Sequence, residues 1–254
     1  MKHQKITDKI ISAFYNSYNH LGYGFCEKTY ENALMIELRT TGLSAKNQFP
    51  IKVYYKDYIV GDYYADILVN GKVLIELKAI KQISKEHKSQ LLRYLHATDI
   101  EVGLILNFSE SPKFERVVYS NDRKQYAKSF AKFESINRNE SIENQIITSF
   151  YNCYNALGYG FLDNVYRKAL SIEFQQNGIE FEESKNLDIY YMEKVIGQLQ
   201  TQFWIDNKMI FVLSRPKLRQ SEKNKIYNML KSTHTKSGMV LNFGNEAEFI
   251  KSRI

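Results

Sequence analysis

The sequence contains few residues that cross-link, bend or anchor a chain, and each shortage excludes a class of protein. Its 254 residues include only 2 cysteines, 3 prolines and 12 glycines, which excludes disulfide-rich and collagen-like proteins. Cys26 and Cys153 show neither metal-site spacing nor a disulfide framework, so we expect a reducing compartment, the cytoplasm. No apolar run approaches the roughly 18 residues of a membrane-spanning helix, so we expect no membrane partner. Residues 1–20 lack the apolar segment of a secretory signal and are typical of an amphipathic helix.

The balance of charges is basic but ordinary for a globular protein. The chain has 44% apolar and 25% charged residues, which excludes a disordered chain, and a net charge of +7. That charge permits an anionic partner without identifying one. Residues 208–236 contain eight basic residues and only one acidic residue, Glu222. This segment is either a solvated helix face or a patch that holds phosphates.

An internal repeat determines the domain organisation. Residues 10–34 and 146–170 match at an offset of 136, and 14 of the 24 positions from Ile11 to Leu34 are identical. The match continues to Gly61 and Gly197, then shifts by one residue, so that residues 103–108 match residues 238–243. We therefore predict a tandem duplication. The expected domains are residues 1–125 and 141–254, joined by a linker at 126–140.

Periodicity predicts the same element order in each copy. In the first copy we expect helices at 5–20 and 27–41, strands at 49–55, 58–69 and 72–78, a helix capped by Ser84 that ends near His96, a strand at 102–107 and an edge strand at 115–119. The predicted fold class is α/β (α+β), with a mixed central sheet flanked by helices in each domain.

Two acids and a lysine converge at the hairpin of the first copy. Asp66 lies near the end of one strand, and Glu76 and Lys78 share one face of the next, because side chains alternate along a strand. Carboxylates are the oxygen ligands that Mg²⁺ prefers, and a nearby lysine can offset the charge of a phosphate. The alternative is a surface hairpin with a cross-strand ion pair.

The hairpin loop decides whether the two acids can act together. A two-residue turn at Asn70–Gly71 would pair Ala65 with Glu76 and point Asp66 to the opposite face. We therefore predict a three-residue loop at residues 69–71, with Gly71 left-handed, or another loop of odd length.

These residues carry a resemblance to a known family. Gly24, Glu27 and Tyr30 fit the GxxExxY signature, and with the hairpin residues and the segment from Gln90 to Tyr94 the first copy resembles the GxxExxY family of the PD-(D/E)XK nuclease superfamily. The resemblance implies two tandem restriction-endonuclease-like domains, a nucleic-acid substrate, with DNA favoured over RNA, and Mg²⁺ or Mn²⁺ as cofactor. It also implies site residues in the first copy: Asp66, Glu76 and Glu27 as metal ligands, Lys78 as a catalytic lysine, and Gln90 and Tyr94 as a helix motif.

The spacing of the helix motif is consistent with this. Gln90 and Tyr94 are four residues apart and share a helix face that could lie against the hairpin. An amphipathic helix that packs through its leucines would have the same spacing. Glu27 at a helix start is also favourable without any function.

The second copy departs from the family pattern. At an offset of 136, Asp66 becomes Gln202, Glu76 becomes Val212 and Lys78 becomes Ser214, while Gln90 and Tyr94 become roughly Ile226 and Leu230. We expect this copy to fold without cutting. It either replaces the partner subunit of an ancestral dimer, which makes the chain an intramolecular pseudo-dimer, or holds nucleic acid. The candidate phosphate-binding residues are Arg215, Lys217, Arg219, Lys223 and Lys225.

The favoured hypothesis is a metal-dependent phosphodiesterase with one active and one degenerate domain. The alternative is a non-catalytic nucleic-acid-binding or scaffold protein in which the first site is also vestigial. The intact set of Asp66, Glu76, Lys78 and Gln90 favours activity, because the second copy has lost these residues.

Overall fold

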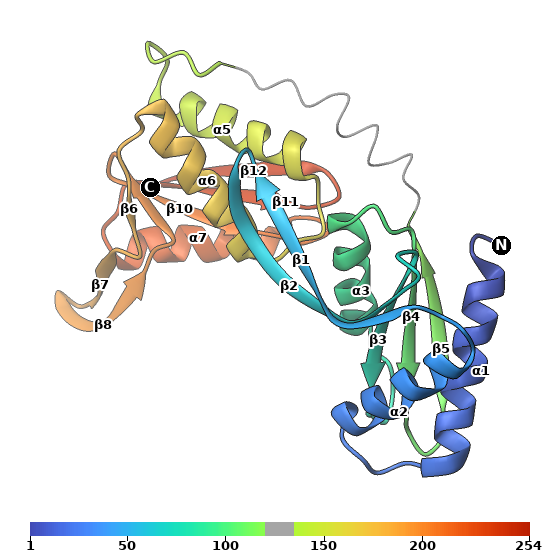
Figure 1. Ribbon diagram of the computed structural model, residues 1–254. Helices are drawn as coiled ribbons and strands as arrows, with labels where there is room; N and C mark the ends of the chain where they lie inside the picture. Colours follow the sequence, from blue (N-terminus) through green and yellow to red (C-terminus); the bar gives the residue numbers. More distant parts are fainter. Residues whose placement is uncertain (120–134) are drawn as a thin grey trace. The chain divides into compact units, whose positions relative to one another are not determined.

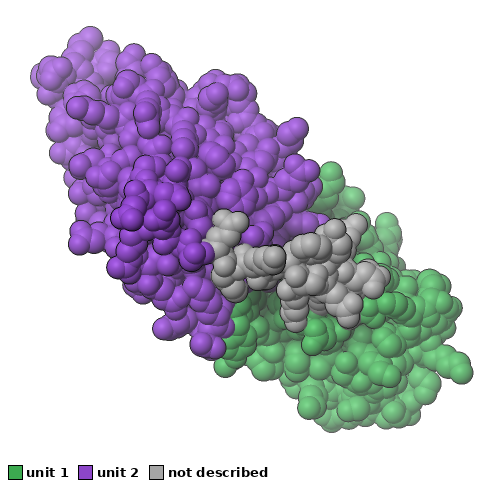
Figure 2. Space-filling view, turned by 90° about the horizontal axis from the view of Figure 1, so that it is seen from above, with its two compact units in different colours: residues 1–54, 61–125 green, residues 55–60, 126–254 purple. Residues whose placement is uncertain are grey.

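The protein is described here by a computed structural model that covers residues 1–119 and 135–254. The chain divides into two compact units: residues 1–54 with 61–125, and residues 55–60 with 126–254 (Figures 1 and 2). Most of the expected linker, residues 126–134, lies outside the described residues, and residues 135–140 form no helix or strand. No helix in the described ranges is long and apolar enough to cross a membrane.

The first repeat has the predicted element order. Its elements are α1 (Gln4–Leu21), α2 (Glu27–Thr40), β1 (Ala45–Tyr55), β2 (Tyr58–Val69), β3 (Val73–Lys78), α3 (Lys85–Ala97), β4 (Val102–Asn107) and β5 (Lys113–Val118). They form a sheet of order β1-β2-β3-β4-β5. Strands β3 and β4 are parallel, whereas β3 pairs antiparallel with β2 and β4 with β5. The mixed sheet and the edge position of β5 are confirmed.

Helices cover both faces of this sheet. Helices α1 and α2 pack on one face through a cluster that includes Phe14, Tyr30 and Leu34, together with Ile75 and Leu104 of the sheet. Helix α3 packs on the other face in a second cluster. Every residue of β4 is buried, as expected for a central strand without alternation.

The second repeat folds in the same way, except that its sheet is split. Its elements are α5 (Ile142–Leu157), α6 (Asp163–Asn177), β6 (Glu182–Glu183), β7 (Asn186–Tyr191), β8 (Lys194–Gln200), β9 (Phe203–Ile205), β10 (Lys208–Leu213), α7 (Gln220–Ser232), β11 (Ser237–Phe243) and β12 (Ala247–Arg253). The main sheet has the order β12-β11-β10-β9-β6, and β7 and β8 form a separate two-stranded sheet.

The repeated glycine–tyrosine segment has a structural role in both copies. The Tyr30 hydroxyl donates a hydrogen bond to the Gly22 carbonyl at 3.0 Å, and its ring stacks on Phe108 with centroids 4.1 Å apart. The Tyr166 hydroxyl donates to the Gly158 carbonyl at the same 3.0 Å, in the second copy. These contacts fix the turn between the first two helices of each repeat, so the tyrosine of the signature supports the fold.

A one-residue difference between the repeats lies in the hairpin loop. In the first copy Val69 pairs with Val73, which leaves the three-residue loop 70–72. In the second copy Ile205 pairs with Lys208, which leaves a two-residue loop whose residues both have positive φ, 45° and 58°. The shorter loop accounts for the shift in the sequence match and changes which residues correspond beyond it.

Candidate active site

The hairpin loop brings Asp66 and Glu76 to the same side of the sheet. The loop has the odd length that we predicted, although it spans 70–72 rather than 69–71, and Gly71 is left-handed with φ of 65°. Because Ile67 pairs with Ile75, the next position outward sets Asp66 opposite Glu76. The Asp66 Oδ2 atom accepts a hydrogen bond from the Leu77 amide at 2.6 Å, which fixes its carboxylate against β3.

Glu76 is the most buried of the candidate metal ligands. Its side chain is 3% exposed, and its Oε1 atom accepts hydrogen bonds from Lys78 Nζ at 2.8 Å and Gln90 Nε2 at 2.6 Å. Its other oxygen, Oε2, is buried without a hydrogen-bond partner. Burial, followed by the nearby charge of Asp66, raises the pKa of Glu76 to about 7, against the opposing effect of Lys78. Burial also raises the pKa of Asp66.

Lys78 is held as a cation rather than a free base. Burial by itself would lower its pKa, but the hydrogen bond and charge of Glu76 outweigh this and raise the pKa of Lys78 above its ordinary value. A lysine in this state can stabilise negative charge on a phosphate, whereas it is a poor acceptor for a proton.

Helix α3 contributes two further polar groups to the same place. Gln90 Nε2 donates to Glu76 Oε1 and, at 2.8 Å, to the hydroxyl of Tyr94, so both members of the predicted helix motif lie over β3. His87 has a structural role, because its Nδ1 atom accepts a hydrogen bond from the Ser84 amide at 3.0 Å and caps α3.

Glu27 lines the same open cleft as Asp66. It begins α2, and its Oε1 atom accepts a hydrogen bond from the Ala79 amide at 3.3 Å, just beyond β3. The cleft has a volume of about 600 Å³ and is lined by Glu27, Asp66 and the buried Glu31, among others. Sequence reasoning missed Glu31, whose carboxylate accepts hydrogen bonds from Lys28, Asn47 and Gln48. The repeat offered a signal for Glu31, because the second copy has Arg167 at the corresponding position and has thus lost the acid.

The donor set fits a divalent cation that keeps part of its water shell. Among the residues that the structure describes, no three Asp, Glu, His or Cys side chains converge closely enough to hold a metal by themselves. The first unit instead offers two facing carboxylates, one with an unpartnered buried oxygen. Mg²⁺ is commonly bound by one or two carboxylates and several waters, and a bound cation would favour the ionised form of both acids against the burial that raises their pKa values.

The structure corrects the correspondence that we expected between the two sites. The Leu77 amide bonds to Asp66, and the Val212 amide bonds to Gln202, so Val212 matches Leu77 rather than Glu76. Leu77 pairs with Leu106 and Val212 pairs with Leu241, and these two leucines are equivalent in the repeat. Glu76 therefore corresponds to Phe211.

The same one-residue shift applies to the residues that follow. Lys78 corresponds to Leu213, while Ser214 occupies the position of Ala79 and donates a hydrogen bond to Asp163. Leu91 lies closest to Gly103, and Ile226 lies against Gly238, so these two helix residues correspond. Gln90 and Tyr94 are thus replaced by Lys225 and Met229, not by Ile226 and Leu230. In the described part of the second unit, these positions do not form the hydrogen-bonded acid–lysine–glutamine arrangement.

The five basic candidates of the second unit are exposed. They lie in the loop before α7 and on its first two turns: Arg215, Lys217, Arg219, Lys223 and Lys225. They are free to contact an anion, and a solvated surface also explains their exposure.

Comparison with known proteins identifies the repeat. Residues 4–117 and residues 140–253 each match the family model of the PD-(D/E)XK nuclease superfamily, and the two matches cover more than half of the chain. No curated protein matches the chain. The crystal structure of SSO0001 is similar at 14% identity, with a TM-score of 0.31, over 52% of this chain and 65% of that chain. The match thus spans slightly less than two thirds of the length of SSO0001.

Proposed function

Because the chain belongs to the PD-(D/E)XK nuclease superfamily, we propose that its first unit is a metal-dependent nuclease that cleaves phosphodiester bonds of nucleic acid. The observation that carries this proposal is the Glu76 carboxylate, which is buried, bonded to Lys78 and Gln90 on one oxygen and unpartnered on the other. Burying such an acid is costly unless a cation or a proton compensates it. Within the superfamily, we propose that the chain belongs to the GxxExxY family.

Each residue of the candidate site has a role in this proposal. Asp66 and Glu76 would hold Mg²⁺ or Mn²⁺ directly, with Glu27 as a further acidic ligand from the start of α2. The bound ion would act as a Lewis acid on the phosphate and lower the pKa of a water molecule. Lys78, charged and 12% exposed, would stabilise the negative charge that develops on the phosphate.

Gln90 and Tyr94 would orient the site from α3. The Gln90 amide holds one Glu76 oxygen at 2.6 Å and leaves the other free to bind a cation. The Tyr94 hydroxyl in turn accepts a hydrogen bond from this amide and fixes its rotamer. We propose DNA as the substrate in preference to RNA.

We propose that the second unit is a pseudo-nuclease whose primary role is that of a built-in partner. Its counterparts of Asp66, Glu76 and Lys78 are Gln202, Phe211 and Leu213, none of which is an acidic metal ligand or a cation. The tip of the hairpin encoded by the first repeat, residues 55–60, belongs to the second compact unit. A role in holding nucleic acid is the second candidate, favoured by the five exposed basic residues.

A cleavage assay tests the proposed activity. Labelled single- and double-stranded DNA and RNA are incubated with the full chain and Mg²⁺ or Mn²⁺, beside Asp66→Asn, Glu76→Gln and Lys78→Ala. We expect the three variants to lose cleavage, with Lys78→Ala affecting turnover more than metal binding. Gln202→Ala is the matched control at the position that corresponds to Asp66, and it should cleave as the wild type does. Full activity in Glu76→Gln would exclude the assignment.

A binding assay distinguishes the two roles of the second unit. A variant in which the five basic residues are neutralised is compared with the wild type at several salt concentrations. A built-in partner predicts unchanged affinity and an unchanged salt slope. Weaker binding with a shallower salt slope would show that these residues contact phosphates, because each contact that is lost reduces the number of counterions released on binding.

A further inference from the structure

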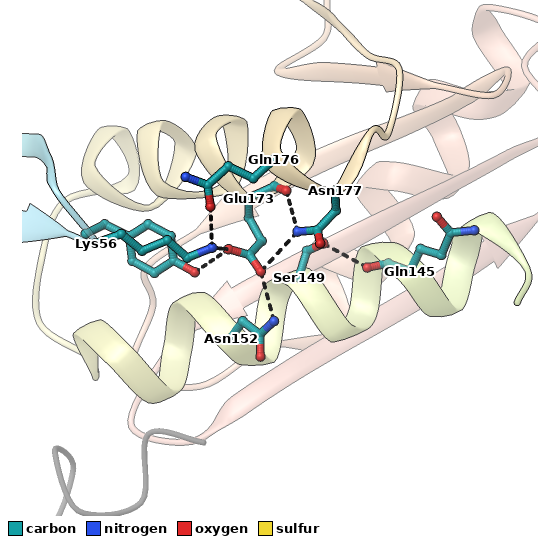
Figure 3. Close-up of polar contacts among 8 residues, drawn as sticks. Lys56, Gln145, Ser149, Asn152, Glu173, Gln176 and Asn177 are labelled. Atoms are coloured by element: carbon teal, nitrogen blue, oxygen red, sulfur yellow. Dashed lines mark hydrogen bonds and ion pairs between the residues drawn. The ribbon is translucent and has the colours of Figure 1, made fainter. Parts of the chain in front are cut away.

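A buried acidic residue in the second unit anchors the tip of a hairpin. Glu173 on α6 is 2% exposed, and its Oε2 atom accepts hydrogen bonds from the Tyr55 hydroxyl and from Lys56 Nζ, each at 2.6 Å. Its Oε1 atom accepts one from Asn152 Nδ2 of α5 at 2.8 Å, and Asn177 lies on the same oxygen (Figure 3). Both oxygens are therefore satisfied, and the α5–α6 pair is an acceptor for the β1–β2 hairpin tip.

The duplication gives the chain a second copy of each partner. At the offset of 136, Tyr55 corresponds to Tyr191 at the tip of the β7–β8 hairpin. The acceptor residues Asn152 and Glu173 correspond to Asn16 of α1 and Glu37 of α2. The chain thus contains a second hairpin tip, residues 191–196, and a second acceptor on the α1–α2 pair.

The second hairpin tip carries apolar side chains that are exposed among the residues that the structure describes. Tyr55 is 1% exposed, whereas its counterpart Tyr191 is 61% exposed. Val60 is 0% exposed, whereas its counterpart Ile196 is 65% exposed. Met192 and Val195 are exposed as well. A contiguous group of large apolar side chains on the surface is typical of an interaction site.

The α1–α2 surface has the same asparagine–glutamate pair, but there it is more exposed to solvent. Asn16 Nδ2 donates to Glu37 Oε2 at 3.3 Å, which repeats the bond between Asn152 and Glu173, but Asn16 is exposed and Glu37 is half-buried. Ile36 beside it is also exposed. The α1–α2 surface therefore offers a carboxylate for a tyrosine hydroxyl next to an apolar side chain.

We propose that the β7–β8 hairpin tip of one chain docks on the α1–α2 surface of a second copy of this chain. In this contact Tyr191 would donate to Glu37 while Ile196 is covered, as Tyr55 and Val60 are in the second unit. The contact joins different surfaces of the two copies, so it is heterologous and can repeat from one copy to the next. Because Met192 replaces Lys56, this contact lacks a counterpart of the ion pair between Lys56 and Glu173, so it is weaker than the contact in the second unit and reversible.

A complementation experiment with full-length chains tests this contact. The donor variant carries Tyr191→Ser and Ile196→Ser, and the acceptor variant carries Asn16→Ala and Glu37→Arg; all four positions are at the surface or half-buried, and circular dichroism checks that both variants fold. Sedimentation velocity is measured over a range of protein concentrations. The wild type should form assemblies that grow with concentration. Each variant alone should self-associate with a dissociation constant at least about tenfold higher than that of the wild type. An equimolar mixture of the two variants should form dimers and nothing larger, because only one competent tip and one competent acceptor remain.

The controls separate this contact from other causes of association. Tyr227→Ser removes another exposed apolar side chain, on α7, and should leave the association unchanged. A wild type that stays monomeric at every concentration would refute the proposal, as would a mixture of the two variants that stays monomeric. The result is independent of cleavage, so failure here leaves the proposed nuclease activity intact.

Discussion

Replacing Glu76 with glutamine should change how the stability of the metal-free protein depends on pH. The pKa of Glu76 is raised to about 7 by burial and by the charge of Asp66. Below the ordinary value of 4.5, the carboxyl is protonated in both the folded and the unfolded state, and it adds no pH dependence. Between 4.5 and about 7, the unfolded chain releases its proton while the folded chain keeps it, so the free energy of unfolding falls as pH rises.

The size of this effect follows from the same two values. Each pKa unit corresponds to about 1.36 kcal/mol, so ionised Glu76 costs the folded state about 3 kcal/mol above pH 7. The group is buried, and its Oε2 atom has no hydrogen-bond partner, so water does little to screen this cost.

Urea denaturation with a chelator at pH 5 and pH 8 measures the effect. We expect the wild type to lose about 3 kcal/mol more than Glu76→Gln between the two pH values, and Mg²⁺ to restore much of this loss at pH 8. Glu115→Gln removes a half-exposed glutamate that is paired with Lys88, and it should retain the loss seen in the wild type because it leaves Glu76 in place. An equal pH dependence in the wild type and Glu76→Gln would refute the reasoning.

Two further substitutions test the structural framework, each with a counterpart in the other repeat. Glu173→Ala removes a buried carboxylate that accepts hydrogen bonds from Tyr55, Lys56 and Asn152, and it should lower the free energy of unfolding by about 3–5 kcal/mol in urea denaturation. Glu37→Ala, at the half-buried counterpart, should cost less than about 1 kcal/mol; equal losses would contradict the burial of Glu173. The Asn107 side chain accepts a hydrogen bond from the Ile80 amide at 3.1 Å and donates one to the Ile80 carbonyl at 2.8 Å, just after Lys78. Asn107→Ala should therefore lower the free energy of unfolding by about 1–3 kcal/mol and reduce cleavage. Asn242→Ala removes the same bonds in the second unit and should reduce stability without slowing cleavage.

Most of the first repeat was predictable because its signals are local. The apolar spacing of α1, the Ser84 cap of α3 and the continuous apolar run of β4 each depend on neighbouring residues alone. The odd hairpin loop followed from a chemical requirement, namely that Asp66 and Glu76 share a side, against the local preference of Asn70–Gly71 for a two-residue turn.

The errors arose where the answer depends on pairing between distant segments. The sequence match shows that one residue is missing from the second copy, but not where. Only the strand register puts the deletion in the hairpin loop and replaces Glu76 by Phe211 rather than Val212. The anchor of the hairpin tip on Glu173 was missed for a related reason, since Tyr55 and Glu173 are 118 positions apart in the chain.

Counting bound metal ions tests most directly whether the first unit alone retains a metal site. Isothermal titration of the full chain with Mn²⁺ is compared with Asp66→Asn and with Gln202→Ala, which changes the corresponding residue of the second unit. We expect one ion per wild-type chain, none in Asp66→Asn, and one in Gln202→Ala. Binding that survives in Asp66→Asn, or that disappears in Gln202→Ala, would contradict a metal site formed by Asp66 and Glu76 in the first unit.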